Sequence, residues 1–256
     1  MVSAALFSSL LMSTTTHSHP TSKEYVDSQI NQLAVIINGL QSQVNQQAQY
    51  NQAGDAKLNQ QILNLSQQFT TYNQTVDARF KQLEHEIGES YQGGIVFYVD
   101  ESKQHGLVVA KMDANRGGAL PWQNGESGDK AINARANGVL AGDANTNLII
   151  AEETIDDQEG QFAALISRSF SVQDDGLSPC DESNLSCFGR WYLPSAYELK
   201  LLKENLYAKG LGDLSGIYWS STEQSVSEAW QLDFNQGDLE VRDKMSLAKV
   251  RPIHAF

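Results

Sequence analysis

The chain has 256 residues, of which 41% are hydrophobic and 19% charged, and its formal net charge is −13. This composition is typical of one sizeable globular domain with an extended segment. The acidic excess lies after residue 87, where 14 Lys and Arg residues accompany 25 Asp and Glu residues. Because so acidic a segment is repelled by phosphate backbones, we expect no nucleic-acid partner.

Residues 1–22 resemble the remains of an export signal. A short apolar run at residues 4–12 precedes a polar stretch, although no Lys or Arg comes before the run. The run is too short to span a bilayer, and no other stretch approaches about 20 apolar residues. We therefore expect a secreted or cell-surface protein without a transmembrane anchor.

The two cysteines, Cys180 and Cys187, enclose a short polar and acidic loop. This spacing closes a small ring easily and predicts a disulfide, which suits an oxidising compartment. The alternative is a pair of free thiols in a cytosolic protein. A metal site would need more ligands than these two residues supply.

Residues 23–87 carry apolar residues at alternating steps of three and four, which predicts a left-handed coiled coil. A lone helix would expose so narrow a stripe, so we expect a parallel homo-oligomer. Ile and Leu in the first half favour a dimer, whereas bulky aromatic residues in the second half suit a trimer, which we prefer. The expected oligomerisation residues are Ile30, Leu33, Ile37, Leu40, Val44, Leu58, Ile62, Leu65, Phe69, Tyr72, Val76 and Leu83.

The heptad frame shifts between the two halves of this segment. The seam positions there are polar or small, and they include Gln47, Asn51 and Gly54. Glycine costs a helix about 1 kcal/mol relative to alanine, so a weak point or hinge is expected there. A continuous helix would form a rod about 95 Å long, which suits a stalk.

Residues 88–256 predict an α+β domain. Residues 93–99 and 107–110 read as a strand hairpin, and short strands are expected at 217–222, 229–234, 239–242 and 249–256. Helices are expected at 161–170 and 196–207, the second with Ser195 as N-cap and Glu198 completing a capping box. Strands at both ends around a helical middle indicate that the termini of the domain meet in one sheet.

Several ordered motifs of this domain resemble the C-terminal domain family of the Legionella collagen-like adhesin. They occupy residues 91–100, 105–110, 191–199, 218–223 and 250–253. The resemblance implies a C-type-lectin-like α+β head on a trimeric stalk at the bacterial surface, and sulfated glycosaminoglycans as ligands. This chain departs from the family because a coiled coil replaces the collagen repeat and because the head is strongly acidic.

Candidate ligand-binding residues follow from their chemistry. Trp122 lies in a loop rich in Gly, Pro and Asn, where we expect an exposed aromatic ring. Trp191, Trp219 and Trp230 are expected in the core. Basic residues concentrate in the last third, where they either form a groove for sulfates or pair with acidic neighbours on a solvated surface. The candidates among them are Arg190, Arg242, Lys244, Lys249 and Arg251.

No metal or cofactor is expected. Carboxylates cluster at residues 156–159, 174–175 and 181–182, but no calcium-loop spacing accompanies them, so solvated acidic loops are expected. No nucleophile, metalloprotease or phosphate-loop motif is present, and we expect no enzyme, although a glycosidase carboxylate pair stays open. The sequence predicts an oligomeric adhesin that binds an extracellular glycan. The alternative is a module that binds a host-surface protein or has a structural role.

Overall fold

The computed structural model describes residues 23–48, 52–125, 129–155, 160–180 and 186–256. The expected export signal at residues 1–22, and the carboxylates at 156–159 and 181–182, lie outside these ranges. The chain forms two compact units, residues 1–82 and 83–256, which we call the helical unit and the head.

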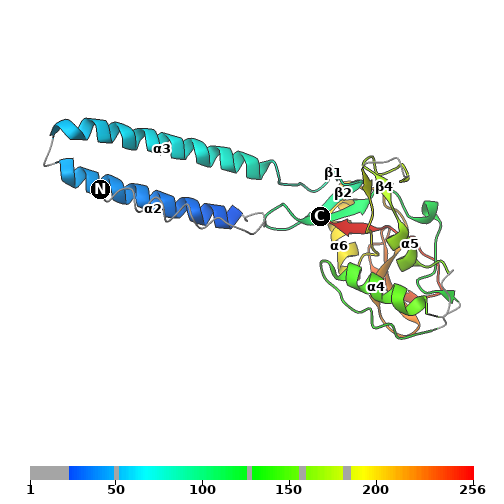
Figure 1. Cartoon of the computed structure of the whole chain (residues 1–256). Coiled ribbons are helices and arrows are strands. Elements are labelled where there is room, and N and C mark those ends of the chain that lie inside the picture. The colour runs from blue at the N-terminus through cyan, green and yellow to red at the C-terminus, as the bar shows by residue number, and fades with distance from the viewer. Residues whose placement is uncertain (1–22, 49–51, 126–128, 156–159, 181–185) are drawn as a thin grey trace. The chain divides into compact units, whose positions relative to one another are not determined.

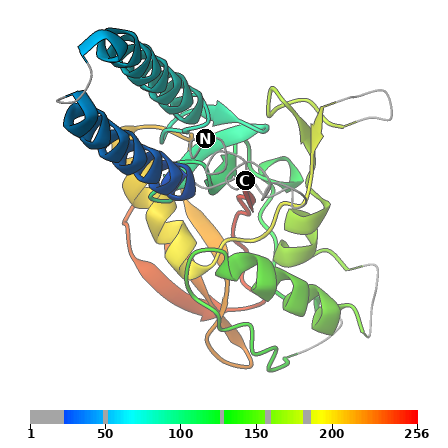
Figure 2. The same ribbon diagram turned by 60° about the vertical axis from the view of Figure 1, so that its left-hand side comes forward.

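The helical unit contains two helices where the sequence predicts one. α2 (Lys23–Ala48) and α3 (Gln52–Lys81) lie side by side and run in opposite directions (Figures 1 and 2). The expectation of one continuous helix over 23–87 is therefore not met. Residues 49–51, between the two helices, lie outside the described ranges, whereas Gln47 lies in α2 and Gly54, where a weak point was expected, lies in α3. α3 also ends before the expected limit, and Ile87 packs against the core of the head.

The head is an α+β domain, as predicted. Its largest sheet has the strand order β1-β2-β3-β9, so the first and last strands of the head share one sheet (Figure 1). A second sheet has the order β6-β7-β8, and β4 and β5 form a small hairpin. All paired strands in these sheets are antiparallel. The strands are β1 (Ser90–Tyr91), β2 (Gly94–Val99), β3 (Gly106–Ala110), β4 (Val172–Gln173), β5 (Cys187–Phe188), β6 (Ile217–Glu223), β7 (Glu228–Asp233), β8 (Leu239–Asp243) and β9 (Ile253–Ala255).

Helices pack around these sheets. α4 (Ala141–Glu153) and α5 (Ala163–Ser169) contact each other, and α6 (Ala196–Asn205) packs against β2, β6 and β7 (Figure 2). α6 begins with the predicted capping box, in which Ser195 and Glu198 each satisfy a backbone N–H of the other. Its apolar face joins a core cluster that includes Phe97, Leu199 and Tyr218. Short 3-10 turns occur at η1 (Asn115–Gly117) and η3 (Tyr207–Lys209).

The two ends of the head meet at one edge, which we call the terminal edge. Gly106 and Phe256 exchange backbone hydrogen bonds of 3.1 and 3.2 Å. The imidazole of His85, near the start of the head, lies 4.9 Å from the Phe256 ring, measured between ring centroids. From this edge a ladder of backbone hydrogen bonds extends through the head, in which the last residue of β3 and the residues after it pair with residues before β9. The ladder bonds join Ala110 to Pro252, Ala114 to Val250, Leu120 to Ala248 and Trp122 to Lys244, at 2.8–2.9 Å.

Candidate ligand-binding surface

The far end of this ladder is a group of loops that are distant in sequence but in contact. We call residues 120–125, 129–135, 223–227 and 243–247 the loop end. Most of these residues lie outside helices and strands, so backbone ladders alone do not fix their positions. Buried polar side chains supply the missing connections, and Lys244 is the central one.

Lys244 has a fully buried side chain. Its ammonium group donates hydrogen bonds to Glu223 Oε1 at 2.7 Å, and to the carbonyl oxygens of Lys130 and Val226 at 2.8 Å each. An ammonium group has three N–H donors, and here each has an oxygen acceptor. The same nitrogen lies 4.7 Å from the centroid of the Trp122 ring, within cation–π distance. One side chain therefore joins three segments of the loop end.

Glu223 extends this connection, and its carboxylate is also fully buried. In addition to Lys244, it accepts hydrogen bonds from the backbone N–H groups of Ile132 at 2.8 Å and Asn133 at 2.6 Å. Each carboxylate oxygen thus has at least one charged or backbone donor. Because a buried charge is tolerated only when it is paired and hydrogen-bonded, this arrangement explains how the ion pair can lie in the interior.

Trp122 is buried, which contradicts the expectation of an exposed aromatic ring. Its indole N–H donates to the carbonyl of Ser220 at 2.8 Å, and its backbone N–H donates to the carbonyl of Lys244. The surrounding Gly, Pro and Asn residues form a loop, as predicted, but the ladder turns the tryptophan into the core. Trp191 and Trp219 are also buried, as expected, whereas Trp230 is half-buried and donates to Gln224.

Two further buried groups hold the neighbouring loops. Glu153, at the end of α4, accepts a hydrogen bond from the backbone N–H of Asn124 at 2.9 Å, and burial raises the pKa of its carboxyl group. Arg251 is almost fully buried, and its guanidinium donates to Asp113 at 2.7 Å. It also donates to the carbonyl oxygens of Ala110, Gly212 and Asp213 at 2.9–3.0 Å, which reinforces the ladder.

Four of the five candidate cations lie beside three carboxylates, with Lys249 and Arg251 sharing Asp113. Arg242 pairs with Glu240 at 2.7 Å on the edge strand β8, and Lys249 lies 3.4 Å from Asp113. Lys244 and Arg251 are buried, and this contradicts their expected role as surface contacts for a ligand. Arg190 is exposed and follows β5. The expected sulfate groove thus loses two of its five members, and the pairing of Arg242 with Glu240 agrees with the alternative of a solvated, mixed surface.

Three large apolar side chains of the loop end are exposed, and we call them the apolar patch. Val226 is 50% exposed, Met245 is 49% exposed and Leu247 is 67% exposed. The β7–β8 pairing of Glu228 with Asp243 continues through a hydrogen bond from Lys244 N–H to the Ser227 carbonyl, which brings Val226 beside Met245. Sequence reasoning missed these residues because no periodic pattern surrounds them, and only the strand register reveals their proximity.

Charged groups are also exposed on the loop end. The Arg135 side chain is 59% exposed and lies 3.9 Å from Glu223, and Asp129 is exposed. The loop end thus exposes both apolar and charged side chains, and the buried Lys244 and Glu223 connect its segments from below. Such a surface can contact a ligand without a large ordering cost, because the loops are already fixed.

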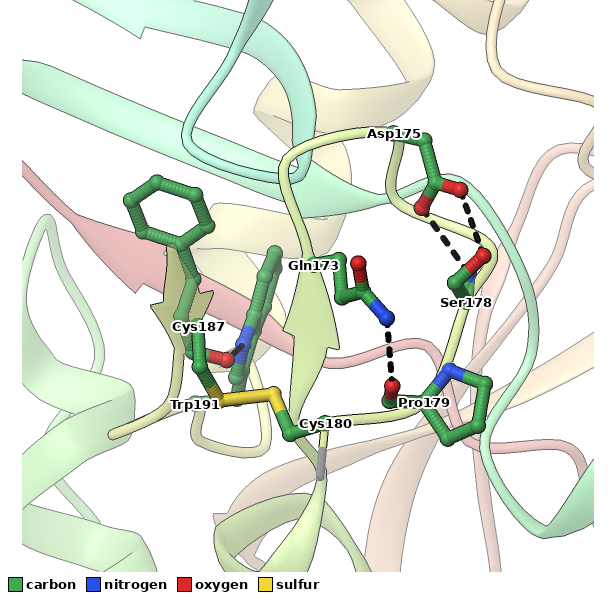
Figure 3. Close-up of a disulfide and its surroundings, with 8 residues drawn as sticks. Gln173, Asp175, Ser178, Pro179, Cys180, Cys187 and Trp191 are labelled. Carbon is green, nitrogen blue, oxygen red and sulfur yellow. Dashed lines mark hydrogen bonds between the residues drawn. A yellow bond between two sulfur atoms is a disulfide. The ribbon is translucent and has the colours of Figure 1, made fainter. Parts of the chain in front are cut away.

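The disulfide lies elsewhere in the head and is confirmed. Cys180 and Cys187 are joined, and the bond ties the β4–β5 hairpin to the segment that follows β4 (Figure 3). Gln173 donates to the Pro179 carbonyl at 2.9 Å within the same hairpin (Figure 3). The hydroxyl and backbone N–H of Ser178 bond to Asp175, which lowers the pKa of that carboxyl group to about 2. The bond is compatible with an oxidising compartment.

The predicted oligomerisation residues divide into two groups in the helical unit. Some are half-buried and others are exposed, although both kinds occur in each of the two heptad blocks. The half-buried ones are Ile30, Leu33, Ile37, Val44, Ile62, Phe69 and Val76. Leu40, Leu58, Leu65 and Tyr72 are 39–58% exposed, and Leu83, which belongs to the head, is 56% exposed.

Within the ranges that the structure describes, no helix is long and apolar enough to cross a membrane. The same ranges contain no group of three or more His, Cys, Asp or Glu residues arranged to hold a metal ion. Neither models of known protein families nor curated proteins give a match to this chain.

Proposed function

We propose that this protein is a secreted or surface-displayed bacterial adhesin, without catalytic activity, whose head binds carbohydrate at the loop end. The observation that carries this proposal is the ladder through the head. The rest of the chain connects to the head at the terminal edge, near His85, and the ladder separates that edge from Trp122 and Lys244. The loop end is thus the part of the head most distant along the ladder from its attachment.

The construction of the loop end also supports binding. Lys244 and Glu223 fix its segments in advance, so that little conformational entropy is lost when a ligand binds. Val226 and Met245 can contact the apolar C–H faces of a pyranose. Arg135 and Asp129, which are exposed on the same loop end, can bond to the hydroxyl groups of the sugar. The motifs of the head that resemble an adhesin family, and the C-type-lectin-like fold which that resemblance implies, favour the same ligand class.

The ligand we favour is a neutral glycan rather than a sulfated one. Arg242, Lys244, Lys249 and Arg251 each lie beside a carboxylate, so their charges are largely compensated before any sulfate approaches. The acidic excess of the head opposes a polyanionic ligand as well. Binding should therefore depend weakly on ionic strength.

Oligomerisation through the helical unit completes the proposal. Leu58, Leu65 and Tyr72 are exposed in the single chain, and burial against helices of further copies in a parallel, trimeric coiled coil would remove them from water. Several heads on one stalk would gain avidity although each binds its glycan weakly. Sedimentation equilibrium of the whole chain is expected to give the mass of an oligomer.

The apolar character of the patch favours a second candidate function. Val226, Met245 and Leu247 could equally pack against apolar side chains of a host-surface protein. That function would need no glycan. The two candidates use the same surface and differ in what covers it.

The test is a glycan array probed with the whole chain, at low and high salt, with calcium and with a chelator. We expect binding to neutral glycans that changes little with salt or chelation. Binding restricted to sulfated glycans and lost at high salt would contradict the proposed ligand class and direct attention to Arg190 and Arg242. A blank array from folded oligomer would contradict carbohydrate binding and leave the protein partner.

A further inference from the structure

The surroundings of the Lys244 ammonium group are those of a bound cation. Three oxygen atoms lie 2.7–2.8 Å from Nζ, and they come from the Glu223 carboxylate and from two backbone carbonyls. Carboxylate and carbonyl oxygens are the ligands that hard metal ions prefer in protein loops. The face of the Trp122 ring, 4.7 Å away, adds a further contact that suits positive charge.

Few regular backbone hydrogen bonds fix the positions of the loops around this ammonium group. Lys130 and Val226 lie in irregular segments separated by nearly a hundred residues, and Trp122 precedes both of them. Backbone pairing reaches Trp122 and Ser227, and a single backbone hydrogen bond, from the Glu223 N–H to the Ala134 carbonyl at 2.8 Å, reaches the end of the Lys130 segment. The side chains of Lys244 and Glu223 bind the rest of that segment, at Lys130, Ile132 and Asn133. Apart from the Lys244 and Glu223 side chains, this segment is held by that one backbone bond and by the buried side chains of Ile132 and Ala134, so a positive charge at this point adds the bonds that join it to Val226 and Trp122.

We propose that Lys244 is a positioning residue that acts as a covalently attached cation and orders the loop end without a bound metal ion. The inference rests on the proposed function only in taking the loop end as the binding surface. It follows that ligand binding persists after chelation of divalent ions, because the cation cannot dissociate from the chain. It also follows that the charge and donors of the side chain, and not its volume, give the loops their order.

A simpler role would be that of packing, and the two roles predict different results. In other proteins a buried ion pair can be replaced by apolar residues of similar volume with little loss. A methionine at position 244 would fill a similar volume, but it would withdraw three donors from Glu223, Lys130 and Val226. Packing alone predicts that methionine suffices, whereas an attached cation predicts that it does not.

The experiment is backbone hydrogen exchange of the whole chain, read by mass spectrometry over the loop end and over β2 and β3. In Lys244→Met we expect exchange of residues 129–135 and 223–227 to become on the order of tenfold faster or more, with β2 and β3 still protected. The matched control is Lys249→Ala, which removes a partly exposed cation paired with Asp113 and should leave the loop end protected. A chelator should not change exchange in the original protein.

A rescue experiment separates charge from volume. Lys244→Ala lacks three carbons and the nitrogen, which n-propylammonium replaces, while 1-propanol has nearly the same size without the charge. We expect n-propylammonium to restore protection of the loop end and 1-propanol not to do so. If the variant does not fold without additive, refolding with the amine and not with the alcohol gives the same support.

Several results would overturn the inference: wild-type protection in Lys244→Met, equal rescue by 1-propanol, no rescue by either additive, or loss of protection on chelation. None of these readouts requires a glycan. A blank glycan array combined with rescue by n-propylammonium would contradict the proposed function and leave the role of Lys244 supported.

Discussion

Ionisable side chains in the interior of the head are enclosed by hydrogen-bonding groups. The Glu198 carboxylate accepts from the backbone N–H groups of Leu140, Gly142 and Ser195, at 2.7–3.2 Å, and from the Tyr192 hydroxyl at 3.1 Å. Burial nevertheless raises the pKa of Glu198, because removal from water penalises its charged form. One carboxylate thereby connects the start of α6 to the start of α4.

His254 is a buried base whose titration we expect to affect stability. Burial against Trp191 lowers the pKa of its imidazole below the ordinary value of 6.5. As pH falls through about 6.5, the unfolded chain binds a proton that the folded head resists. The contribution of the neutral His254 to the free energy of unfolding is therefore fully present above that pH, and it decreases as pH falls toward the lowered pKa.

The variant His254→Gln tests this expectation, since glutamine does not titrate in this range. Urea unfolding at pH 7.5 and pH 5.0 should show a smaller loss of stability in the variant than in the original protein. Other titratable groups, including Glu153 and Glu198, are present in both proteins, so their contributions to the pH dependence of stability cancel when the two proteins are compared. An equal loss in both proteins would show that His254 does not contribute.

At the scale of elements, the β4–β5 hairpin depends on its disulfide. Both strands have only two residues, so their ladder supplies few hydrogen bonds. Closing a loop with a sequence separation of 7 removes unfolded-state entropy worth about 2 kcal/mol. Cys180→Ser combined with Cys187→Ser should lower the free energy of unfolding by about this amount.

Reductant provides the control for this prediction. Urea unfolding of the original protein should shift to lower denaturant concentration when dithiothreitol is added, and the double variant should not respond. The account would be wrong if reduction left the midpoint of the original protein unchanged.

Local sequence patterns predicted local elements well. The Ser195–Glu198 spacing predicts the start of α6, and the apolar runs before and after residues 100–106 predict β2 and β3. These features depend on residues that are neighbours in sequence. The heptad stripe predicts helix over most of residues 23–81, but stripe spacing alone does not say whether the partner is another copy or another part of the same chain.

The candidate site was predicted poorly because it is formed by distant residues. Trp122 is buried because its loop pairs with the segment at Lys244, and Lys244 is buried because Glu223 and two distant carbonyls surround it. The amino-acid composition around Trp122 and around Lys244 does not predict that either side chain is buried. The clustering of basic residues in sequence did not bring them to one surface, since strand geometry distributes them among Glu223, Glu240 and Asp113.

At the scale of the whole molecule, two compact units have different tasks in this account. The helical unit exposes apolar residues of its stripe, which supports self-association, and the head exposes the apolar patch. A weak site on each head is sufficient if several heads act together. The proposed function assigns the choice of ligand to the head.

The central claim is that the loop end binds the glycan, and the most direct measurement compares variants of the whole chain on one glycan array. Val226→Ser combined with Met245→Ser changes two half-exposed side chains of the patch, and Leu177→Ser is a matched control on the β4–β5 hairpin, where that side chain is 58% exposed. We predict that the patch variant loses affinity by about tenfold, or about 1.4 kcal/mol, while the control binds like the original protein. Equal binding by all three proteins would contradict the account.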